Sequence, residues 1–269
     1  MKIISDKNKL IKIIQNETNL GFVPTMGAIH KGHISLIKRC MNECKKTVVS
    51  IYINKPQFNR KSDFKKYPRN LKGDISKLKK LKVDVLYLPI TRQIYLNRKN
   101  RKLKINSFEK KLCGKNRPRH FKAVVDIINR FIKIINPKKI YFGKKDMQQL
   151  ILIEDFVKKN YPKIKIIGCK TVREKNGIAL SSRNFLLSLK EKKTASKIYN
   201  ILKNKKNMLI KNKISFSEIK KIIIKIGANK IDYIKVLDIN KIIKPYKKNN
   251  NYKIFIAYYL KSIRLIDNF

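Results

Sequence analysis

The 269-residue sequence predicts an α/β protein with a doubly wound parallel sheet, followed by a smaller C-terminal α+β region. Two observations lead to this fold class. Up to about residue 173, short apolar runs alternate with segments whose apolar residues recur at helical spacing, which is typical of parallel strands joined by helices. Beyond residue 173, helical segments are followed by strand-like segments, which is typical of an α+β arrangement.

The elements of the predicted parallel sheet follow in order from hydrophobic periodicity. Residues 48–53 are nearly continuous and β-branched, as in a strand buried on both faces. In residues 121–135 the apolar positions recur at helical spacing, and Pro137 ends that helix. We expect strands at 20–23, 48–53, 83–88, 139–142 and 164–172. We expect helices at about 6–18, 34–45, 70–81, 121–135 and 147–159.

The remaining segments are less regular. Residues 62–69 read as a connection into a helix, and the strongly basic residues 90–119 lack a clear period and read as an excursion or lid. In the C-terminal region we expect helices at about 189–209 and 216–227 and strands near 233–237 and 253–259.

The net charge of +50 leaves two interpretations open. A nucleic-acid-binding protein is one, because basic clusters follow phosphate backbones. A biased composition is the other, and it is favoured because the lysines are spread along the whole chain rather than gathered in one stripe or tail. We therefore expect no specific nucleic-acid partner, although a basic surface still steers anionic substrates toward the protein.

Composition also limits location and redox chemistry. No N-terminal apolar run of signal-peptide type and no segment of about 20 apolar residues is present, so we expect a cytoplasmic protein without a membrane span. The four cysteines form no CxxC motif and, with three histidines, no obvious zinc site. We expect ordinary reduced thiols and no resident metal site.

The most informative stretch is the sequence GFVPTMGAIHKGHISLIKRC, residues 21–40. A strand, a tight turn and a helix N-terminus aim backbone N–H groups and a positive dipole end at an anion. His30 and His33, at i and i+3, lie on one face of the first helical turn, so both address the same anion. Gly32 between them permits close approach of a phosphate. As imidazolium ions, the two rings would neutralise charge that develops on phosphate oxygens.

Three further polar segments follow predicted strands or open the second half. Asn54 and Gln57 place two amides after the buried strand at 48–53, at the edge where functional loops of open α/β sheets lie. The segment 143–149 repeats the strand–glycine–helix arrangement, with a lysine for phosphates and a carboxylate for a ribose hydroxyl. The segment 181–184 carries one guanidinium, able to bind phosphate in a bidentate way, although its serines and asparagine also suit a helix N-cap.

Together these segments closely resemble the pantothenate synthetase (pantoate–β-alanine ligase) family, within the nucleotidyltransferases that carry an HxGH phosphate site. The matching stretches run from residue 20 to the end of the chain, in family order: VPTMGAIHKGH, VVSIYINKPQF, DFKKYPRN, RPRHFKAVV, NPKKIYFGKKDMQQL, TVREKNGIALSSRN and IRLIDN.

The resemblance implies a Rossmann-like domain (residues 1–175) and a smaller domain (176–269) that closes over the ATP site. It implies a homodimeric ligase of pantothenate biosynthesis that uses ATP and Mg²⁺. In the reaction that it implies, pyrophosphate is released when a pantoyl-adenylate intermediate forms, and AMP is released when β-alanine attacks that intermediate. It implies that His33, His30 and Lys145 are catalytic and that Gln57, Gln149 and Asn54 bind pantoate and β-alanine. The implied ATP-binding residues are Met26, Gly27, Ala28, Ile29, His30, Lys31, Gly32, His33, Gly143, Lys144, Lys145, Asp146, Val172, Leu180, Ser181, Ser182 and Arg183.

Five positions depart from the usual family pattern. A lysine stands in place of an acid at two positions, one between the two histidines and one in the segment 143–146. The proline before Gln57 is displaced by one position. Two further residues differ in the segment 117–124. These positions are Lys31, Lys144, Pro56, Arg119 and Ala123. Because none is a presumed catalytic group, we expect an active enzyme.

Overall fold

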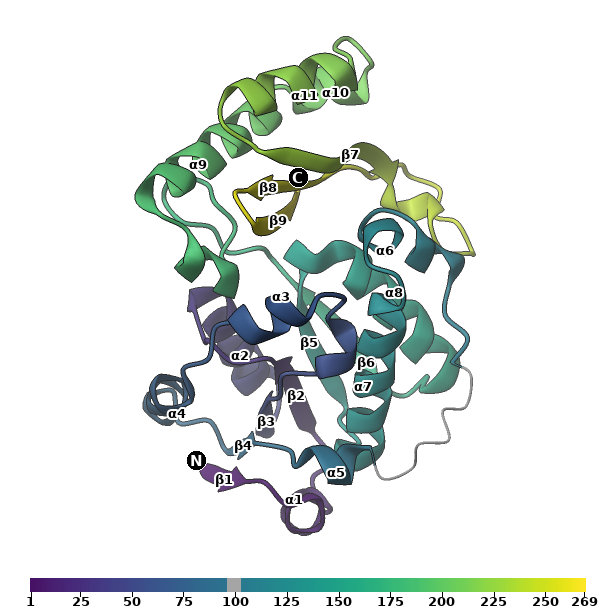
Figure 1. Cartoon of the computed structure of the whole chain (residues 1–269). Helices are drawn as coiled ribbons and strands as arrows, with labels where there is room; N and C mark the ends of the chain where they lie inside the picture. Colours follow the sequence, from purple (N-terminus) through teal and green to yellow (C-terminus); the bar gives the residue numbers. More distant parts are fainter. Residues whose placement is uncertain (96–102) are drawn as a thin grey trace.

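The computed structural model describes residues 1–95 and 103–269, and within these residues the strands form two sheets (Figure 1). One sheet has six strands, all paired in parallel, in the order β1-β4-β3-β2-β5-β6. The other has three antiparallel strands in the order β7-β8-β9. The predicted fold class is confirmed, while the domain boundary at residues 175 and 176 stays a prediction.

The parallel sheet and its connections occupy the first part of the chain. The strands are β1 (Lys2–Ile4), β2 (Leu20–Thr25), β3 (Lys46–Ile51), β4 (Val85–Tyr87), β5 (Lys139–Gly143) and β6 (Lys165–Cys169). The α-helices are α1 (Lys7–Ile14), α2 (Lys31–Glu43), α3 (Lys61–Lys66), α4 (Leu71–Lys80), α5 (Thr91–Ile94), α6 (Cys113–Asn116), α7 (His120–Ile135) and α8 (Met147–Asn160). Short 3₁₀ helices are η1 (Lys55–Gln57), η2 (Ser107–Lys110) and η3 (Lys144–Asp146).

The C-terminal part packs helices on the antiparallel sheet. Its elements are η4 (Ser182–Leu186), α9 (Leu189–Asn204), α10 (Lys206–Ile210), α11 (Phe216–Lys225), β7 (Lys230–Asp238), η5 (Ile239–Lys241), β8 (Tyr252–Leu260) and β9 (Ile263–Asn268). They enclose a core of their own, which includes Ile198, Leu202, Ile219 and Ile256, each at most 1% exposed.

Helices cover both faces of the parallel sheet because successive strand residues point to opposite sides. Phe22 and Val48 pack with α1, α7 and α8, whereas their neighbours Val23 and Val49 pack with α2 and α4. Both strands are therefore apolar on both faces, which explains their nearly continuous apolar runs.

Several predicted elements need correction. Strands β1 and β9 and helix α3 were not expected, because runs of three to six residues are too short to show a period. The helix expected at 189–209 is divided into α9 and α10 at Lys205, and the strand expected to reach residue 172 ends at Cys169. The basic segment 90–119 contains α5, η2 and α6, and its residues 96–102 lie outside the described residues.

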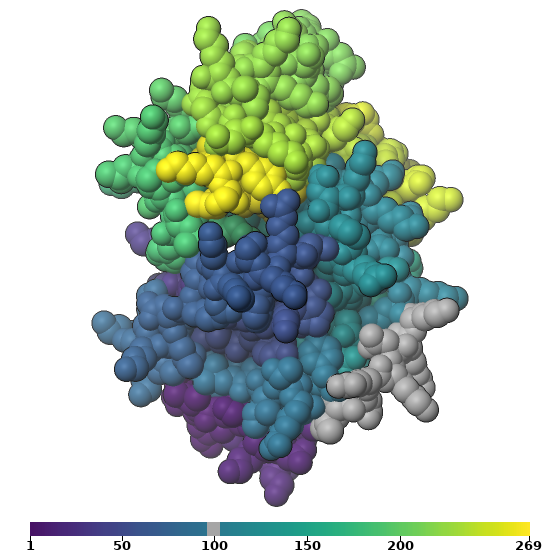
Figure 2. All heavy atoms as spheres, viewed as in Figure 1, coloured from purple at the N-terminus to yellow at the C-terminus, as the bar shows by residue number. Residues whose placement is uncertain are grey.

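The two sheets face each other across the carboxyl ends of the parallel strands. In the space-filling view the C-terminal strands (yellow) lie against the segment that contains α3 (blue; Figure 2). The chain runs outward from β2 through β3 to β4 and then returns to place β5 on the other side of β2, so the strand order reverses between β2 and β5. Ligands of open α/β sheets bind at such a switch point.

Among the described residues, no helix has the length and apolar character needed to cross a bilayer.

Candidate active site

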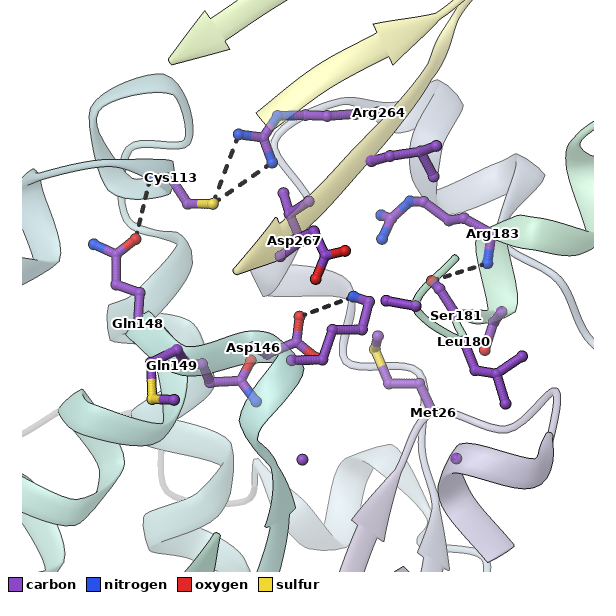
Figure 3. Close-up of a pocket in the computed structure, with 18 of the residues that line it drawn as sticks. Met26, Cys113, Asp146, Gln148, Gln149, Leu180, Ser181, Arg183, Arg264 and Asp267 are labelled. Carbon is purple, nitrogen blue, oxygen red and sulfur yellow. Dashed lines mark hydrogen bonds and ion pairs between the residues drawn. The ribbon is translucent and has the colours of Figure 1, made fainter. Parts of the chain in front are cut away.

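A cavity of about 470 Å³ lies at the switch point, between the two sheets. Loops that follow β2, β3, β5 and β6 line one side, and η4 and the strands of the smaller sheet line the other. Figure 3 shows Met26, Asp146, Gln149 and Arg183 arranged around this space. The four polar segments singled out in the sequence therefore meet in one place.

The two histidines are held by the N-terminus of α2. His30 is the N-cap of this helix, and its Nδ1 accepts a hydrogen bond from the Gly32 N–H (3.1 Å), while Nδ1 of His33 accepts from the His30 N–H (3.4 Å). The ring centroids lie 4.0 Å apart. Because a histidine can cap, α2 begins at Lys31 rather than at Ile34 as expected. A Cβ on Gly32 would lie 2.8 Å from the His30 ring, so glycine at this position lets the imidazole fold back onto the helix.

This arrangement fixes the protonation of both rings. Each Nδ1 accepts a backbone hydrogen bond, so a neutral ring carries its proton on Nε2. Burial, reinforced by the charge of Lys145, lowers the pKa of His30 to about 4. Burial, reinforced by His30, lowers the pKa of His33 to about 3. The expectation of imidazolium ions is therefore wrong for the unliganded chain, in which both rings are neutral Nε2–H donors at pH 7.

Asp74 of α4 holds the turn before the histidines through hydrogen bonds to its backbone. This carboxylate is 1% exposed and accepts hydrogen bonds from the N–H groups of Ala28 (2.7 Å) and Ile29 (2.6 Å). Lys77, one turn further along α4, donates to the Ile29 carbonyl (2.6 Å). Gly27 and Ala28 have positive φ angles (81° and 50°), so the turn is a constrained one that these bonds hold in place.

Asn54 and Gln57 follow β3 and both line the cavity. Asn54 is fixed, because its Nδ2 donates to the Ala123 carbonyl (3.2 Å) and its Oδ1 accepts from the Tyr95 hydroxyl (2.6 Å). The Gln57 side chain contacts Asn54 and the Met26 sulfur and is 8% exposed. The displaced proline, Pro56, lies in the first turn of η1 and leaves Gln57 directed into the cavity.

The turn after β5 presents Lys145 and Asp146. Their side chains pair at 3.3 Å, and both line the cavity. Asn268 of β9 holds this turn by donating to the carbonyls of Lys144 (3.0 Å) and Lys145 (2.7 Å). The C-terminal strand thus positions a loop of the larger sheet.

The two glutamines that follow have different roles. Gln148 is structural, because its amide donates to the carbonyls of Phe108 (2.8 Å) and Lys111 (2.7 Å) and its oxygen accepts from the Cys113 N–H (3.0 Å). Gln149 is half-buried and lines the cavity.

The segment 180–183 reaches the cavity from the C-terminal side. Ser182 donates to the Ala28 carbonyl (3.4 Å) and so links η4 to the turn before the histidines. Arg183 binds both carboxylate oxygens of Asp63 through Nη2 (3.0 and 3.1 Å). Leu180 N–H donates to the Val172 carbonyl (3.0 Å), and both residues line the cavity.

Most of the predicted site residues line the cavity, and five do not. Gly27, Ala28 and Ile29 are buried in the turn behind it, whereas Lys31 and Lys144 are exposed. Those that line it are Met26, His30, Gly32, His33, Asn54, Gln57, Gly143, Lys145, Asp146, Gln149, Val172, Leu180, Ser181, Ser182 and Arg183.

Sequence reasoning missed several residues that support this set, and all of them except Asp74 also line the cavity. Asp74 and Asn268 position loops, Asp63 pairs with Arg183, and Arg117 and His120 contact the Gln57 carbonyl. The scarcity of acids, 17 in 269 residues, was the available signal for the two aspartates. For Arg117 the available signal was its place at the start of the matching stretch RPRHFKAVV, which does not by itself separate it from the other basic residues of that stretch.

Comparisons with known proteins agree on one family. A family model described as pantoate-beta-alanine ligase matches residues 2–269. Pantothenate synthetase of Flavobacterium psychrophilum is 38% identical, the match covering 97% of this chain and 95% of the relative. That of Clostridium botulinum (strain 657 / Type Ba4) is 39% identical, with 99% and 96% covered.

Solved structures give the same result. The pantoate-beta-alanine ligase of Francisella tularensis, complexed with beta-gamma ATP and beta-alanine, matches with a TM-score of 0.85 and 36% identity over 100% of this chain and 97% of that one. Pantothenate synthetase of Thermus thermophilus matches with a TM-score of 0.86 and 28% identity over 100% and 99%.

Proposed function

Because the chain belongs to the pantoate–β-alanine ligase family, we propose that it condenses (R)-pantoate with β-alanine to form pantothenate, converting ATP to AMP and pyrophosphate. The observation that carries the proposal is the pair of imidazoles at the N-terminus of α2, which shares one cavity with Lys145, Gln57 and Arg183. The solved relative that holds ATP and β-alanine together supports the same pair of substrates.

In the first step a pantoate carboxylate oxygen attacks the α-phosphorus of ATP, and the bond to the β,γ-pyrophosphate breaks. Negative charge grows on the phosphate oxygens, and donors fixed in advance toward that charge lower the barrier. His30 and His33 supply neutral Nε2–H donors, and Lys145 supplies a cation. Among the described residues, Asp63 engages Arg183 through Nη2 alone, which leaves the other N–H groups of this guanidinium for a phosphate.

In the second step the amine of β-alanine attacks the acyl carbon of pantoyl adenylate, the C–O bond to AMP breaks, and the amide forms. Gln57 and Gln149 offer uncharged donors and acceptors for the hydroxyls and carboxylate of pantoate, with Asn54 fixed beside Gln57. The cavity is walled by both sheets, an arrangement that limits hydrolysis of the adenylate by water.

Mg²⁺ enters this scheme as part of the substrate MgATP. In phosphate-transfer sites Mg²⁺ keeps several waters and is bound by the substrate phosphates together with one or two carboxylates, rather than by a dedicated protein cage. Among the described residues, no group of three or more His, Cys, Asp or Glu side chains forms a metal cage, and this mode of binding does not require one. We further propose that the protein is a cytoplasmic homodimer, as expected from the sequence.

The proposal is tested by product analysis. Purified protein, pantoate, β-alanine and MgATP should yield pantothenate and AMP in equal amounts. Formation of ADP, or turnover of ATP that does not depend on pantoate, would contradict the adenylate mechanism. His33→Ala protein, checked for folding by circular dichroism, serves as the control for a contaminating ligase.

A further inference from the structure

Arg117 differs from the other partly buried arginines of the cavity wall. Arg183 is paired with Asp63 (3.0 Å), and Arg264 is paired with Asp232 (2.7 Å). Arg117 is half-buried and lines the same cavity, but among the described residues it has no carboxylate partner.

Within the described residues, the hydrogen bonds of Arg117 are to neutral groups. Its Nη1 donates to Nε2 of His120 (3.1 Å), and its Nη2 donates to the Gln57 carbonyl (3.2 Å). His120 in turn donates from Nδ1 to the same carbonyl (2.8 Å), so its ring is neutral and contributes no negative charge. These bonds hold the guanidinium in a fixed orientation beside the loop that carries Gln57.

The surroundings of this guanidinium disfavour its positive charge, so that a bound anion would stabilise it. Burial, and then the charges of Arg183 and Arg264, lower the pKa of Arg117 to about 10. Burial and the charge of Arg117 lower the pKa of His120 to about 3. A partly buried cation without a counter-ion is costly, and a carboxylate placed against it recovers that cost through charge-assisted hydrogen bonds.

We propose that Arg117 binds the carboxylate of β-alanine and thereby orients its amine toward the acyl adenylate. This inference rests on the proposed function. The two substrate carboxylates have different fates: that of pantoate becomes a neutral acyl group in the first step, whereas that of β-alanine stays charged throughout and persists in the product. A guanidinium fixed beside Gln57 and without an acid partner among the described residues suits the carboxylate that remains charged.

The experiment separates the two half-reactions in the full-length protein. Pantoate-dependent exchange of pyrophosphate into ATP reports the first step without β-alanine, and pantothenate formation at varied β-alanine reports the second. For Arg117→Gln we expect an exchange rate within threefold of the wild type and a KM for β-alanine raised at least 30-fold. Arg117→Lys keeps the charge but not the planar set of guanidinium donors, so its KM for β-alanine should lie between those of the wild type and Arg117→Gln.

A second readout uses n-propylamine, which has a methyl group where β-alanine has its carboxylate. The wild type should strongly prefer β-alanine, and Arg117→Gln should reduce that preference at least tenfold. Arg119→Gln is the matched control, because it removes the same charge two residues away, on an exposed side chain outside the cavity. It should change neither assay.

The outcomes are distinguishable. If the wild type shows no pantoate-dependent exchange, the proposed function fails. If exchange is normal but Arg117→Gln leaves the KM for β-alanine and the preference over n-propylamine unchanged, the assignment of Arg117 is wrong. If exchange falls in parallel with the overall reaction, Arg117 supports the Gln57 loop or the first step, and the assignment to β-alanine is equally overturned.

Discussion

Replacing Asp74 with asparagine should loosen the turn that carries the two histidines. The carboxylate of Asp74 is 1% exposed and accepts two backbone hydrogen bonds, at 2.7 and 2.6 Å. Hydrogen bonds to a charged acceptor contribute about 1.5–3 kcal/mol each. An asparagine of the same shape keeps one acceptor but turns an NH₂ group toward the other N–H. We therefore expect the free energy of unfolding to fall by about 2–3 kcal/mol.

Part of this effect should appear in catalysis, because Ala28 and Ile29 lie directly before His30. We expect kcat/KM for AMP formation to fall at least tenfold, measured where urea titration shows the variant to be fully folded. Asp84→Asn is the matched control, since Asp84 is exposed and accepts one N–H, from Thr47 (2.8 Å), at the opposite end of the sheet. Full activity in a destabilised Asp74→Asn protein would refute the positioning role.

Three further predictions concern the same cavity. His33→Ala and Lys145→Ala should each lower kcat by about 10²–10³-fold, the range typical of a lost transition-state donor, with unchanged circular dichroism; an unfolded His33→Ala protein would instead indicate a structural role. Asn268→Ala should lower kcat/KM about tenfold by releasing two carbonyls of the Lys145 turn, and unaltered kinetics would contradict that link. Burial lowers the pKa values of His30, His33 and His120 from 6.5 to about 4, 3 and 3, respectively. Between these lowered values and pH 6.5, the unfolded chain therefore binds more protons than the folded chain. Urea titrations should therefore show stability present above pH 6.5 and lost toward pH 3–4, by up to about 1.4 kcal/mol per pH unit for each histidine; a flat profile would contradict the buried, neutral rings.

The sequence predicted those helices and strands that are long enough to show a recurring pattern of apolar residues. The long elements are of this kind, such as α7 with its apolar residues at helical spacing and β3 with its β-branched run. The short strand β1 pairs with β4, with Lys2 opposite Val85, and β9 pairs with β8. These pairings stabilise the two strands, whose own sequences are too short to show a period. The start of α2 was misplaced because its cap is His30, a residue type that is not among the usual caps.

The candidate site divides in the same way. Residues that follow strands directly, such as His30, Gln57 and Lys145, were predictable because parallel strands bring such loops together. Asp74 and Asn268 were not predictable, since each acts on a loop 45 or more residues away through a hydrogen bond to backbone. The protonation of the histidines was predicted wrongly because burial, which decides it, is a property of the folded chain.

An acyl-adenylate intermediate formed in this cavity can be detected by following the oxygen atoms of the pantoate carboxylate. In the proposed sequence a carboxylate oxygen of pantoate forms the bond to the α-phosphorus and leaves with AMP when the amine attacks the acyl carbon. Pantoate labelled with ¹⁸O in its carboxylate should therefore yield AMP that carries one labelled oxygen for each pantothenate formed, as measured by mass spectrometry. Unlabelled AMP, or label found in inorganic phosphate or pyrophosphate, would rule out the pantoyl adenylate.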